Sequence, residues 1–256
     1  MMKQSSIEWC HRSWNPLPGE CLNAVAGAPC KAYCYMERFY RQNPEMRHPI
    51  RLDEKRMAWS PASAQIIFAF SRIDFLHPDM RRDWQERAIR QMARNQHATY
   101  VILTKFPAEY TKHSWPHNCW LGTTVDGLSH TMDNLYDLMR SVSPDYTRFV
   151  SYEPLLKEPS ELWTLPVPPF RSALVYVPEQ FGTLSWAIIG ADSNAGADKP
   201  SQCWADTLVT DFQQQKIPVL VKDNYNYEKR VKEMPGGWVI TDDGLIQTQK
   251  IQPELF

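Results

Sequence analysis

The chain has 256 residues, of which 43% are hydrophobic and 22% are charged, and its formal net charge is −1. These values are typical of a globular protein that is long enough to bury a large core. No run approaches 18 consecutive apolar residues, so we expect no membrane span, and the first residues lack the pattern of a secretion signal. We therefore expect a cytosolic protein, in which six cysteines bind a metal or are simply buried rather than form disulfides.

Short apolar runs alternate with amphipathic stretches along the chain. An early strand is expected near Ile7–Trp9, followed by a cysteine-rich loop and a helix at 34–42. Further strands are predicted at 66–73, 99–105, 119–125, 147–153, 186–191 and 217–222, with helices at 79–95, 129–141 and 202–215. Apolar strands separated by helices indicate an α/β protein with a covered parallel sheet. A partial or full (β/α) barrel is the predicted architecture, and a doubly wound sheet is the alternative.

Two segments depart from this alternation. Residues 163–184 are rich in proline and predict an irregular insertion, such as a lid or a small hairpin. Residues 236–256 predict a C-terminal hairpin, turning at Asp242-Asp243-Gly244, and a short tail. We interpret both as parts of one domain that spans residues 1–256.

The small net charge conceals an uneven distribution of basic and acidic residues along the chain. Residues 1–112 contain 17 Lys and Arg against 11 Asp and Glu, whereas the remainder contains 11 against 18. A basic group follows the cysteine loop and comprises Arg38, Arg41, Arg47, Arg51, Lys55 and Arg56. Such a group is typical of a surface that binds a polyanion. The alternative interpretation is that these basic residues lie on a solvated pair of helices and form ion pairs within the protein.

Polar and ionisable residues recur where the predicted strands end. The carboxyl ends of barrel strands are the usual position of functional residues. If the sheet closes as expected, five of them surround one cavity: Asp74, Lys105, Glu153, Asp192 and Lys222. Polar strand ends are also common simply because they emerge into solvent, but the repetition over successive strands favours a site.

Three cysteines, Cys21, Cys30 and Cys34, follow a C-x8-C-x3-C spacing in the early loop. Three thiolates can hold an iron–sulfur cluster and leave one iron open to a substrate or cofactor such as S-adenosylmethionine. Small residues around them would let the backbone wrap closely, and Tyr33 and Tyr35 could shield the cluster and contact adenine.

Zinc is the alternative metal, although structural zinc sites usually pair two short C-x2-4-C hooks. Only Cys30 and Cys34 form a close pair, and the fourth ligand would come from Cys10 or His11. Burial is the simpler explanation for Cys119 and Cys203.

The chain resembles the radical S-adenosylmethionine superfamily, and more closely a phage-borne three-cysteine family of largely unknown function. The resemblance rests on the order and spacing of several blocks. These are Ile7-Glu8-Trp9, Ser13-Trp14-Asn15-Pro16, the loop ending at Cys34-Tyr35, Ile102 to Lys105, Trp120-Leu121-Gly122, Phe149 to Leu156 and Trp186 to Ser193. The cysteine spacing is longer than the commonest one of the superfamily, and Ser71-Arg72-Ile73-Asp74 stands where Gly-Gly-Glu is usual.

The resemblance implies a partial (β/α)6 barrel of the TIM type, a 4Fe–4S cluster and S-adenosylmethionine bound at the strand ends. Cys21, Cys30 and Cys34 would be the cluster ligands. The residues placed near S-adenosylmethionine are Tyr33, Tyr35, Ser71, Asp74, Thr123, Ser151 and Gly190. The candidate catalytic residues are Glu153, Lys105 and Asp192.

This resemblance implies radical chemistry that begins with hydrogen abstraction and needs an external electron donor. DNA is the expected substrate, through hypermodification of a base that is flipped out of the duplex, as in isomerisation of an amino-acid adduct on thymine. The phosphate contacts would come from Arg38, Arg41, Arg47, Arg51 and Arg56. The reaction would take place in the host cytoplasm if a phage encodes the protein. Two alternatives stay open: a radical enzyme acting on a small metabolite or nucleotide, and a zinc-stabilised nucleic-acid-binding protein without catalysis.

Overall fold

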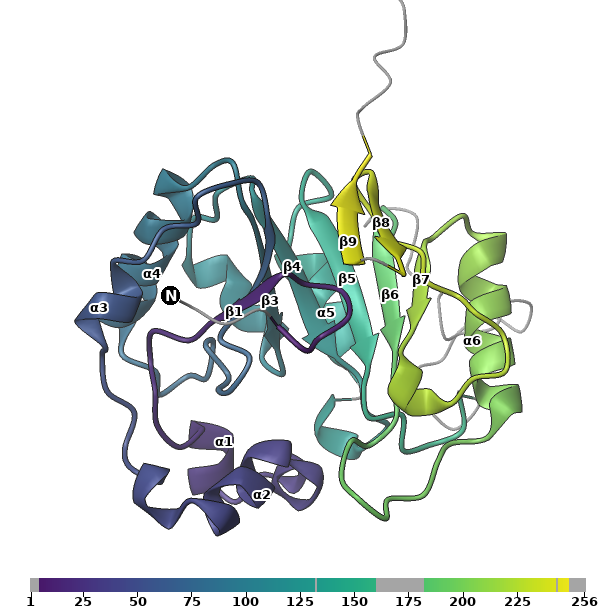
Figure 1. Ribbon diagram of the computed structural model, residues 1–256, viewed down its shortest axis with the longest axis horizontal. Helices are drawn as coiled ribbons and strands as arrows, with labels where there is room; N and C mark the ends of the chain where they lie inside the picture. The colour runs from purple at the N-terminus through teal and green to yellow at the C-terminus, as the bar shows by residue number, and fades with distance from the viewer. Residues whose placement is uncertain (1–4, 132, 160–181, 243, 249–256) are drawn as a thin grey trace, which may run out of the picture.

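The computed structural model describes residues 5–131, 133–159, 182–242 and 244–248. Its described part contains a seven-stranded parallel sheet whose strands follow one another in sequence order. The sheet curls into a half-barrel (Figure 1). Its strands are β1 (Arg12–Trp14), β2 (Ile66–Ala69), β3 (Thr99–Thr104), β4 (Cys119–Thr124), β5 (Thr147–Tyr152), β6 (Trp186–Ile189) and β7 (Val219–Val221).

Helices cover the convex face of the sheet. These helices are α4 (Arg82–Arg94), α5 (Asn134–Ser141) and α6 (Gln202–Gln214). The short helices α1 (Leu22–Val25), α2 (Tyr35–Gln42) and α3 (Glu54–Met57) belong to the segment between β1 and β2. Single 3-10 turns are η1 (Pro29–Tyr33), η2 (Pro44–Met46), η3 (Pro107–Lys112), η4 (Ser129–Thr131) and η8 (Asp223–Tyr225). Apolar residues of α4 and α6, such as Met92 and Phe212, pack into the larger core cluster with Ile102 and Val219 of the strands. This burial accounts for the amphipathic pattern of these helices.

The predicted α/β architecture is confirmed, with six of the strands at the predicted positions. The early strand is wrong in position, because Ile7–Trp9 lies in a turn and β1 is formed by Arg12–Trp14, paired with β2. A doubly wound sheet is excluded because the strand order never reverses. The predicted helix at 129–141 is divided into η4 and α5.

A second core cluster fills the concave face of the half-barrel. Since side chains alternate across a strand, Trp120, Phe149 and Trp186 face this side. Trp9 and Trp238, from the N-terminal segment and the C-terminal hairpin, complete the cluster. Aromatic side chains therefore close the concave face where the strands begin.

The C-terminal hairpin is confirmed as β8 (Trp238–Thr241) paired antiparallel with β9 (Gly244–Gln247). The predicted tail and most of the predicted insertion at 163–184 lie outside the described residues. Within the described part, no helix is both long and apolar enough to cross a membrane.

Candidate functional site

The three cysteines lie on one excursion between β1 and β2, beyond the carboxyl ends of the strands. Cys21 precedes α1, Cys30 lies in η1, and Cys34 precedes α2. Helices α1 and α2 lie at the end of the half-barrel opposite the C-terminal hairpin (Figure 1). The loop is therefore placed where functional groups of β/α barrels usually lie.

Asp74, in the loop after β2, fixes the start of this excursion to the sheet. Its Oδ1 accepts hydrogen bonds from Thr104 Oγ1 (2.6 Å) and the Leu76 N–H (3.3 Å). Its Oδ2 accepts from Asn23 Nδ2 (3.2 Å) and the Lys105 N–H (2.9 Å), and its own N–H donates to Cys21 Sγ (3.3 Å). A carboxylate has about four lone-pair sites, so protein donors occupy them all. The contact predicted between Asp74 and S-adenosylmethionine is untested, and the structure gives Asp74 a supporting role.

Two further contacts join the cysteine loop to other strand ends. The Tyr33 hydroxyl donates to Asp126, which follows β4 and is fully buried. Asn194 Nδ2, after β6, donates to the Tyr33 carbonyl (2.8 Å). Burial and the Asp126 carboxylate both raise the pKa of Tyr33, so its hydroxyl stays a proton donor at neutral pH. The loop is thus bound to the ends of β2, β4 and β6.

The three cysteines are free thiols. Burial and the neighbouring Asp74 raise the pKa of the Cys21 thiol to about 11. Burial also raises the pKa of Cys30, against the effect of Lys105. The charge of Cys34 also contributes to the raised pKa of both thiols. Without a metal, Cys21 and Cys30 are therefore protonated at neutral pH, and a metal would have to displace their protons.

Among the described residues, no three His, Cys, Asp or Glu side chains lie close enough to hold a single metal ion. An iron–sulfur cluster spreads its thiolates over different irons, so its ligands stand farther apart than those of one zinc ion. The Asp74 N–H that reaches Cys21 is also the kind of hydrogen bond that surrounds cluster sulfurs. The thiols of Cys21, Cys30 and Cys34 are the donors that a cluster would use, and the described residues form no ready ligand group for a single zinc ion.

The predicted fourth zinc ligands lie at the other end of the sheet. His11 precedes β1, and its ring nitrogens contact the Ile66 N–H (3.0 Å) and the Leu245 carbonyl (3.1 Å). Cys10 is buried in the aromatic cluster of the concave face. Neither can join Cys21 without unfolding β1, so the alternative of a four-ligand zinc site is not supported.

Glu153, Gly190 and Lys222 form one row across three neighbouring strands. Each directly follows a residue of the register row Tyr152, Ile189 and Val221, whose side chains pack on the helix-covered side. The alternation of side chains directs the row toward the concave face. Lys222 Nζ donates to Glu153 Oε1, with side-chain exposures of 16% and 23%.

Gly190 leaves room for this ion pair. A Cβ atom built there would lie 3.0 Å from both Cγ and Cδ of Glu153. A side chain at position 190 would therefore press on the carboxylate that Lys222 contacts. This requirement is steric, since Gly190 does not have a positive φ.

The other residues predicted near S-adenosylmethionine differ in their exposure and in the face of the sheet on which they lie. The Ser71 hydroxyl bonds Asn15 (3.1 Å), and the exposed Tyr35 donates to the Ser71 carbonyl (2.6 Å). Thr123 is fully buried, and its hydroxyl donates to the Thr104 carbonyl (2.9 Å). Thr123 shares the helix-covered side of β4 with Leu121, whereas Thr124 faces the concave side.

The five predicted strand-end residues divide into two groups in the structure. Asp74 and Lys105 lie beside the cysteines, whereas Glu153 and Lys222 pair with each other. Asp192 lies after β6, where its Oδ1 accepts from the Asn194 N–H and Nδ2, both at 2.8 Å. Asn194 in turn donates to the Tyr33 carbonyl, which connects Asp192, and not the Glu153–Lys222 pair, to the cysteine loop.

The predicted basic surface is partly neutralised. Arg47 pairs with Glu20 (2.9 Å) and Glu37 (2.7 Å), and Arg56 pairs with Asp53 (3.2 Å). The others predicted to contact phosphates are exposed and form no ion pair within the described part of the chain: Arg38, Arg41 and Arg51. Of the arginines predicted to contact phosphates, these three are not neutralised by a carboxylate among the described residues.

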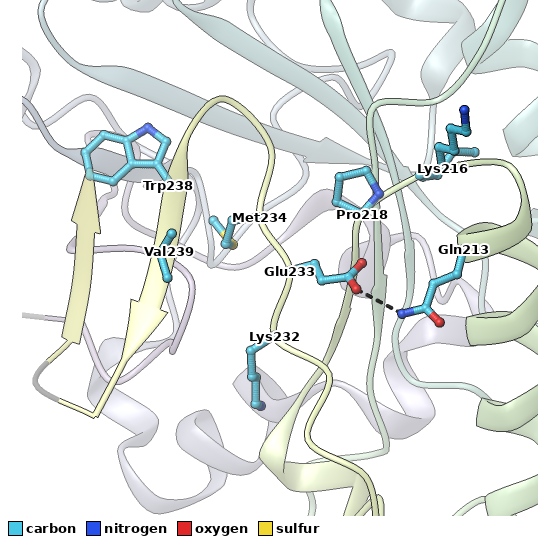
Figure 2. A pocket seen from close by; sticks show the side chains of 9 residues that line it. Gln213, Lys216, Pro218, Lys232, Glu233, Met234, Trp238 and Val239 are labelled. Carbon is cyan, nitrogen blue, oxygen red and sulfur yellow. Dashed lines mark hydrogen bonds between the residues drawn. The ribbon is translucent and has the colours of Figure 1, made fainter. Parts of the chain in front are cut away.

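A groove occurs at a different place, between the end of α6, the start of β7 and the C-terminal hairpin (Figure 2). Figure 2 shows Gln213 donating to Glu233 across its floor, at 2.9 Å. Ile217 and Pro218 line it and directly precede β7, so the groove lies at the amino end of that strand. It is therefore separate from the cysteine loop.

Sequence reasoning missed two residues of the site. Asp126 lies two residues after the buried strand β4, and this position at a strand end could have identified it. His130 carried no signal, yet its Nε2 lies 3.6 Å from Asp126 Oδ2 and both ring nitrogens are buried without a hydrogen bond. Burial lowers the pKa of His130, so its ring is neutral at pH 7.

Fold and site together define an α/β half-barrel protein with a three-cysteine loop over the carboxyl ends of its strands. The chain belongs to the family described as "Protein of unknown function (DUF5131)", whose model matches residues 4–246. No curated protein and no solved structure matches the chain.

Proposed function

We propose that this protein is a radical S-adenosylmethionine enzyme, in which Cys21, Cys30 and Cys34 hold a 4Fe–4S cluster. The observation that carries the proposal is the attachment of three free cysteines to the ends of β2, β4 and β6. A bound cluster would supply the electron, received from an external donor, that cleaves S-adenosylmethionine to a carbon radical.

The half-barrel supports this proposal because its concave face is polar only toward the cysteine loop. Lys105, Thr124, Ser151 and the Glu153–Lys222 pair lie at that end, while the aromatic cluster fills the other. Lys105 lies close enough to Cys30 to lower its pKa against the effect of burial, so its ammonium can balance negative charge at the cysteines. These residues would bind and orient the substrate, and the packed aromatic end would exclude water.

A nucleic-acid base is the proposed substrate class, with the reaction taking place in the cytosol. Arg38, Arg41 and Arg51 are exposed and form no ion pair within the described residues, and they follow the cysteine loop in sequence. They could contact the phosphates on either side of a base that enters the site. If these arginines have no effect on binding, a small nucleotide is the expected substrate instead.

The cluster is tested by anaerobic purification followed by iron and sulfide analysis. We expect about four irons per chain, a visible absorption of the iron–sulfur type, and 5′-deoxyadenosine on reduction with S-adenosylmethionine. Cys30→Ala should lose all three signals. The matched control is Cys203→Ala, at an exposed cysteine of α6, which should keep them. One zinc per chain without iron would overturn the proposal.

Nucleic-acid binding is tested with a thymine-containing duplex oligonucleotide at several salt concentrations. The triple variant Arg38→Gln/Arg41→Gln/Arg51→Gln should bind it more weakly. The slope of log affinity against log salt should become shallower by about 0.9 for each phosphate that the variant no longer neutralises.

The control removes the same number of charges from α4, as Arg82→Gln/Arg87→Gln/Arg90→Gln, where each arginine already pairs with a glutamate. Equal weakening in both variants would show a general charge effect and contradict a phosphate-binding surface.

A further inference from the structure

We propose that one face of α2 binds a single-stranded segment of nucleic acid, with Tyr35 as the platform on which an unpaired base stacks and with Arg38 and Arg72 as phosphate contacts. This inference rests on the proposed function and deepens it, because it names the form in which the nucleic acid is bound. The feature that carries it is an exposed aromatic ring that is held in place beside arginines without ion pairs.

The ring of Tyr35 is both exposed and anchored. Tyr35 is the first residue of α2, and it is 49% exposed. Its hydroxyl donates a hydrogen bond to the Ser71 carbonyl at 2.6 Å, which fixes the far end of the side chain. A tyrosine has only two side-chain torsions, so this bond holds the ring in one orientation. Little conformational entropy is then lost when a base stacks on it.

Arg72 is positioned next to this ring. It directly follows Ser71, and its guanidinium lies over the ring of Phe39, with Cζ 5.6 Å from the ring centroid. Phe39 is four residues after Tyr35, so the two rings lie on the same face of α2. The cation–π contact therefore places Arg72 beside Tyr35 without neutralising its charge.

The charge of this face matches a phosphate backbone. Arg72 and Arg38 are exposed and form no ion pair among the described residues, and Arg38 is three residues after Tyr35 on the helix. Glu37 also belongs to α2, but Arg47 neutralises it at 2.7 Å. Proteins bind single strands with this combination of basic groups and aromatic rings, because every nucleotide carries a phosphate and every base has a face that can stack.

A second exposed tyrosine lacks this arrangement. Tyr136 of α5 is 38% exposed, and the guanidinium of Arg140 lies over its ring at 5.4 Å from the centroid. A base could stack on that face of Tyr136 only by displacing Arg140. In the part of the chain that the structure describes, no guanidinium lies over Tyr35. The bases of a duplex are already stacked on one another, so the open ring favours an unpaired strand.

The test measures binding of a fluorescently labelled thymidine oligonucleotide of about 12 nucleotides to the anaerobically purified full-length protein, by anisotropy at several salt concentrations. Tyr35→Leu removes the aromatic face and the hydroxyl, whereas Tyr35→Phe removes the hydroxyl alone. The difference between these two variants therefore reports stacking rather than the anchoring of α2. Arg72→Gln tests the phosphate contact, and Tyr136→Leu is the matched control.

We expect Tyr35→Leu to bind the strand about tenfold more weakly than the wild type, the equivalent of about 1.4 kcal/mol, with an unchanged dependence on salt. Tyr35→Phe should stay within about threefold of the wild type, and Tyr136→Leu should bind as the wild type does. Arg72→Gln should make the slope of log affinity against log salt shallower by about 0.7. A duplex of the same length should bind Tyr35→Leu and the wild type equally.

Two further measurements identify the contact and the kind of strand. With 5-iodouracil in the oligonucleotide, the photochemical cross-link should map to Tyr35 by mass spectrometry, and a cross-link confined to other elements would contradict the inference. A uridine oligoribonucleotide of equal length distinguishes the two sources of a single strand. Tighter binding of the ribonucleotide would identify RNA, and tighter binding of the deoxyribonucleotide would identify DNA.

The inference is overturned if the strand does not bind the wild type, if Tyr35→Leu binds it unchanged, or if Tyr35→Leu and Tyr136→Leu weaken binding equally. Weaker binding of S-adenosylhomocysteine by Tyr35→Leu, with strand binding unchanged, would assign Tyr35 to the cofactor and also overturn it. Its failure is distinguishable from that of the proposed function. Strand binding requires neither iron nor cleavage of S-adenosylmethionine, whereas the proposed function fails when the purified protein contains no iron.

Discussion

Individual polar side chains in this protein differ most in how fully they are hydrogen-bonded. Asp74 uses all its lone pairs on protein donors, while Glu153 leaves one oxygen without a donor in the described structure. Both carboxylates follow strands, and nothing in the sequence distinguishes them. The difference assigns Asp74 to holding the loop, whereas Glu153 contacts Lys222 and keeps its other oxygen open.

Gly190→Ala tests how tightly the ion pair is fitted to the sheet. We expect a decrease of about 1 kcal/mol in unfolding free energy, because the new Cβ displaces the Glu153 side chain. Urea unfolding followed by circular dichroism measures this. In a Glu153→Ala background the same change should become neutral or stabilising by up to about 1 kcal/mol, since alanine restricts the unfolded chain. An equal penalty in both backgrounds would contradict the steric explanation.

At the level of elements, the site belongs to loops, and the sheet determines where those loops meet. The cysteine excursion contains only short helices, α1 and α2, which cannot hold their position by their own stability. Its attachment depends on Asp74, Asp126 and Asn194, each from a different strand end.

Asp74→Ala should release the start of the cysteine excursion. Four donors would be left without their acceptor, and we expect a decrease of about 3 kcal/mol in unfolding free energy. After chelation of metals, alkylation of Cys21 by iodoacetamide should also become faster relative to the exposed Cys203.

Asp79→Ala is the control, in the same loop but with its side chain 84% exposed. It should change stability by no more than about 0.5 kcal/mol and leave alkylation unaltered. Similar effects of the two substitutions would contradict the proposed role of Asp74 in holding the loop.

At the level of the whole molecule, the two ends of the chain close the amino end of the half-barrel. The N-terminal segment contributes Trp9, and the hairpin contributes Trp238 and Leu245. His11 joins them: the Ile66 N–H donates to Nδ1, so Nε2 carries the proton and donates to the Leu245 carbonyl. Burial lowers the pKa of His11.

This histidine should make stability depend on pH. Its pKa in the folded protein lies below the unfolded value of 6.5, so its contribution is complete above that value and disappears as the pH falls. We expect the unfolding free energy, measured in urea, to decrease from pH 7 to pH 5. His11→Gln should reduce this pH dependence, whereas His48→Gln should leave it unchanged. A full pH dependence in His11→Gln would contradict the assignment.

The sequence by itself determined six of the seven strands of the parallel sheet, the approximate positions of the three long helices and the α/β class, because apolar periodicity and strand length are local properties. It also identified the cysteine loop and most strand-end residues, since parallel strands bring their carboxyl ends to one edge. It could not decide which of Thr123 and Thr124 faces the concave side, because neighbouring residues of a strand point to opposite faces of the sheet. Only the tertiary structure decided that Asp74 is saturated, that Cys10 and His11 lie away from Cys21, and that Lys222 reaches Glu153 across Gly190. Those facts depend on contacts between segments far apart in the chain, which local patterns do not encode.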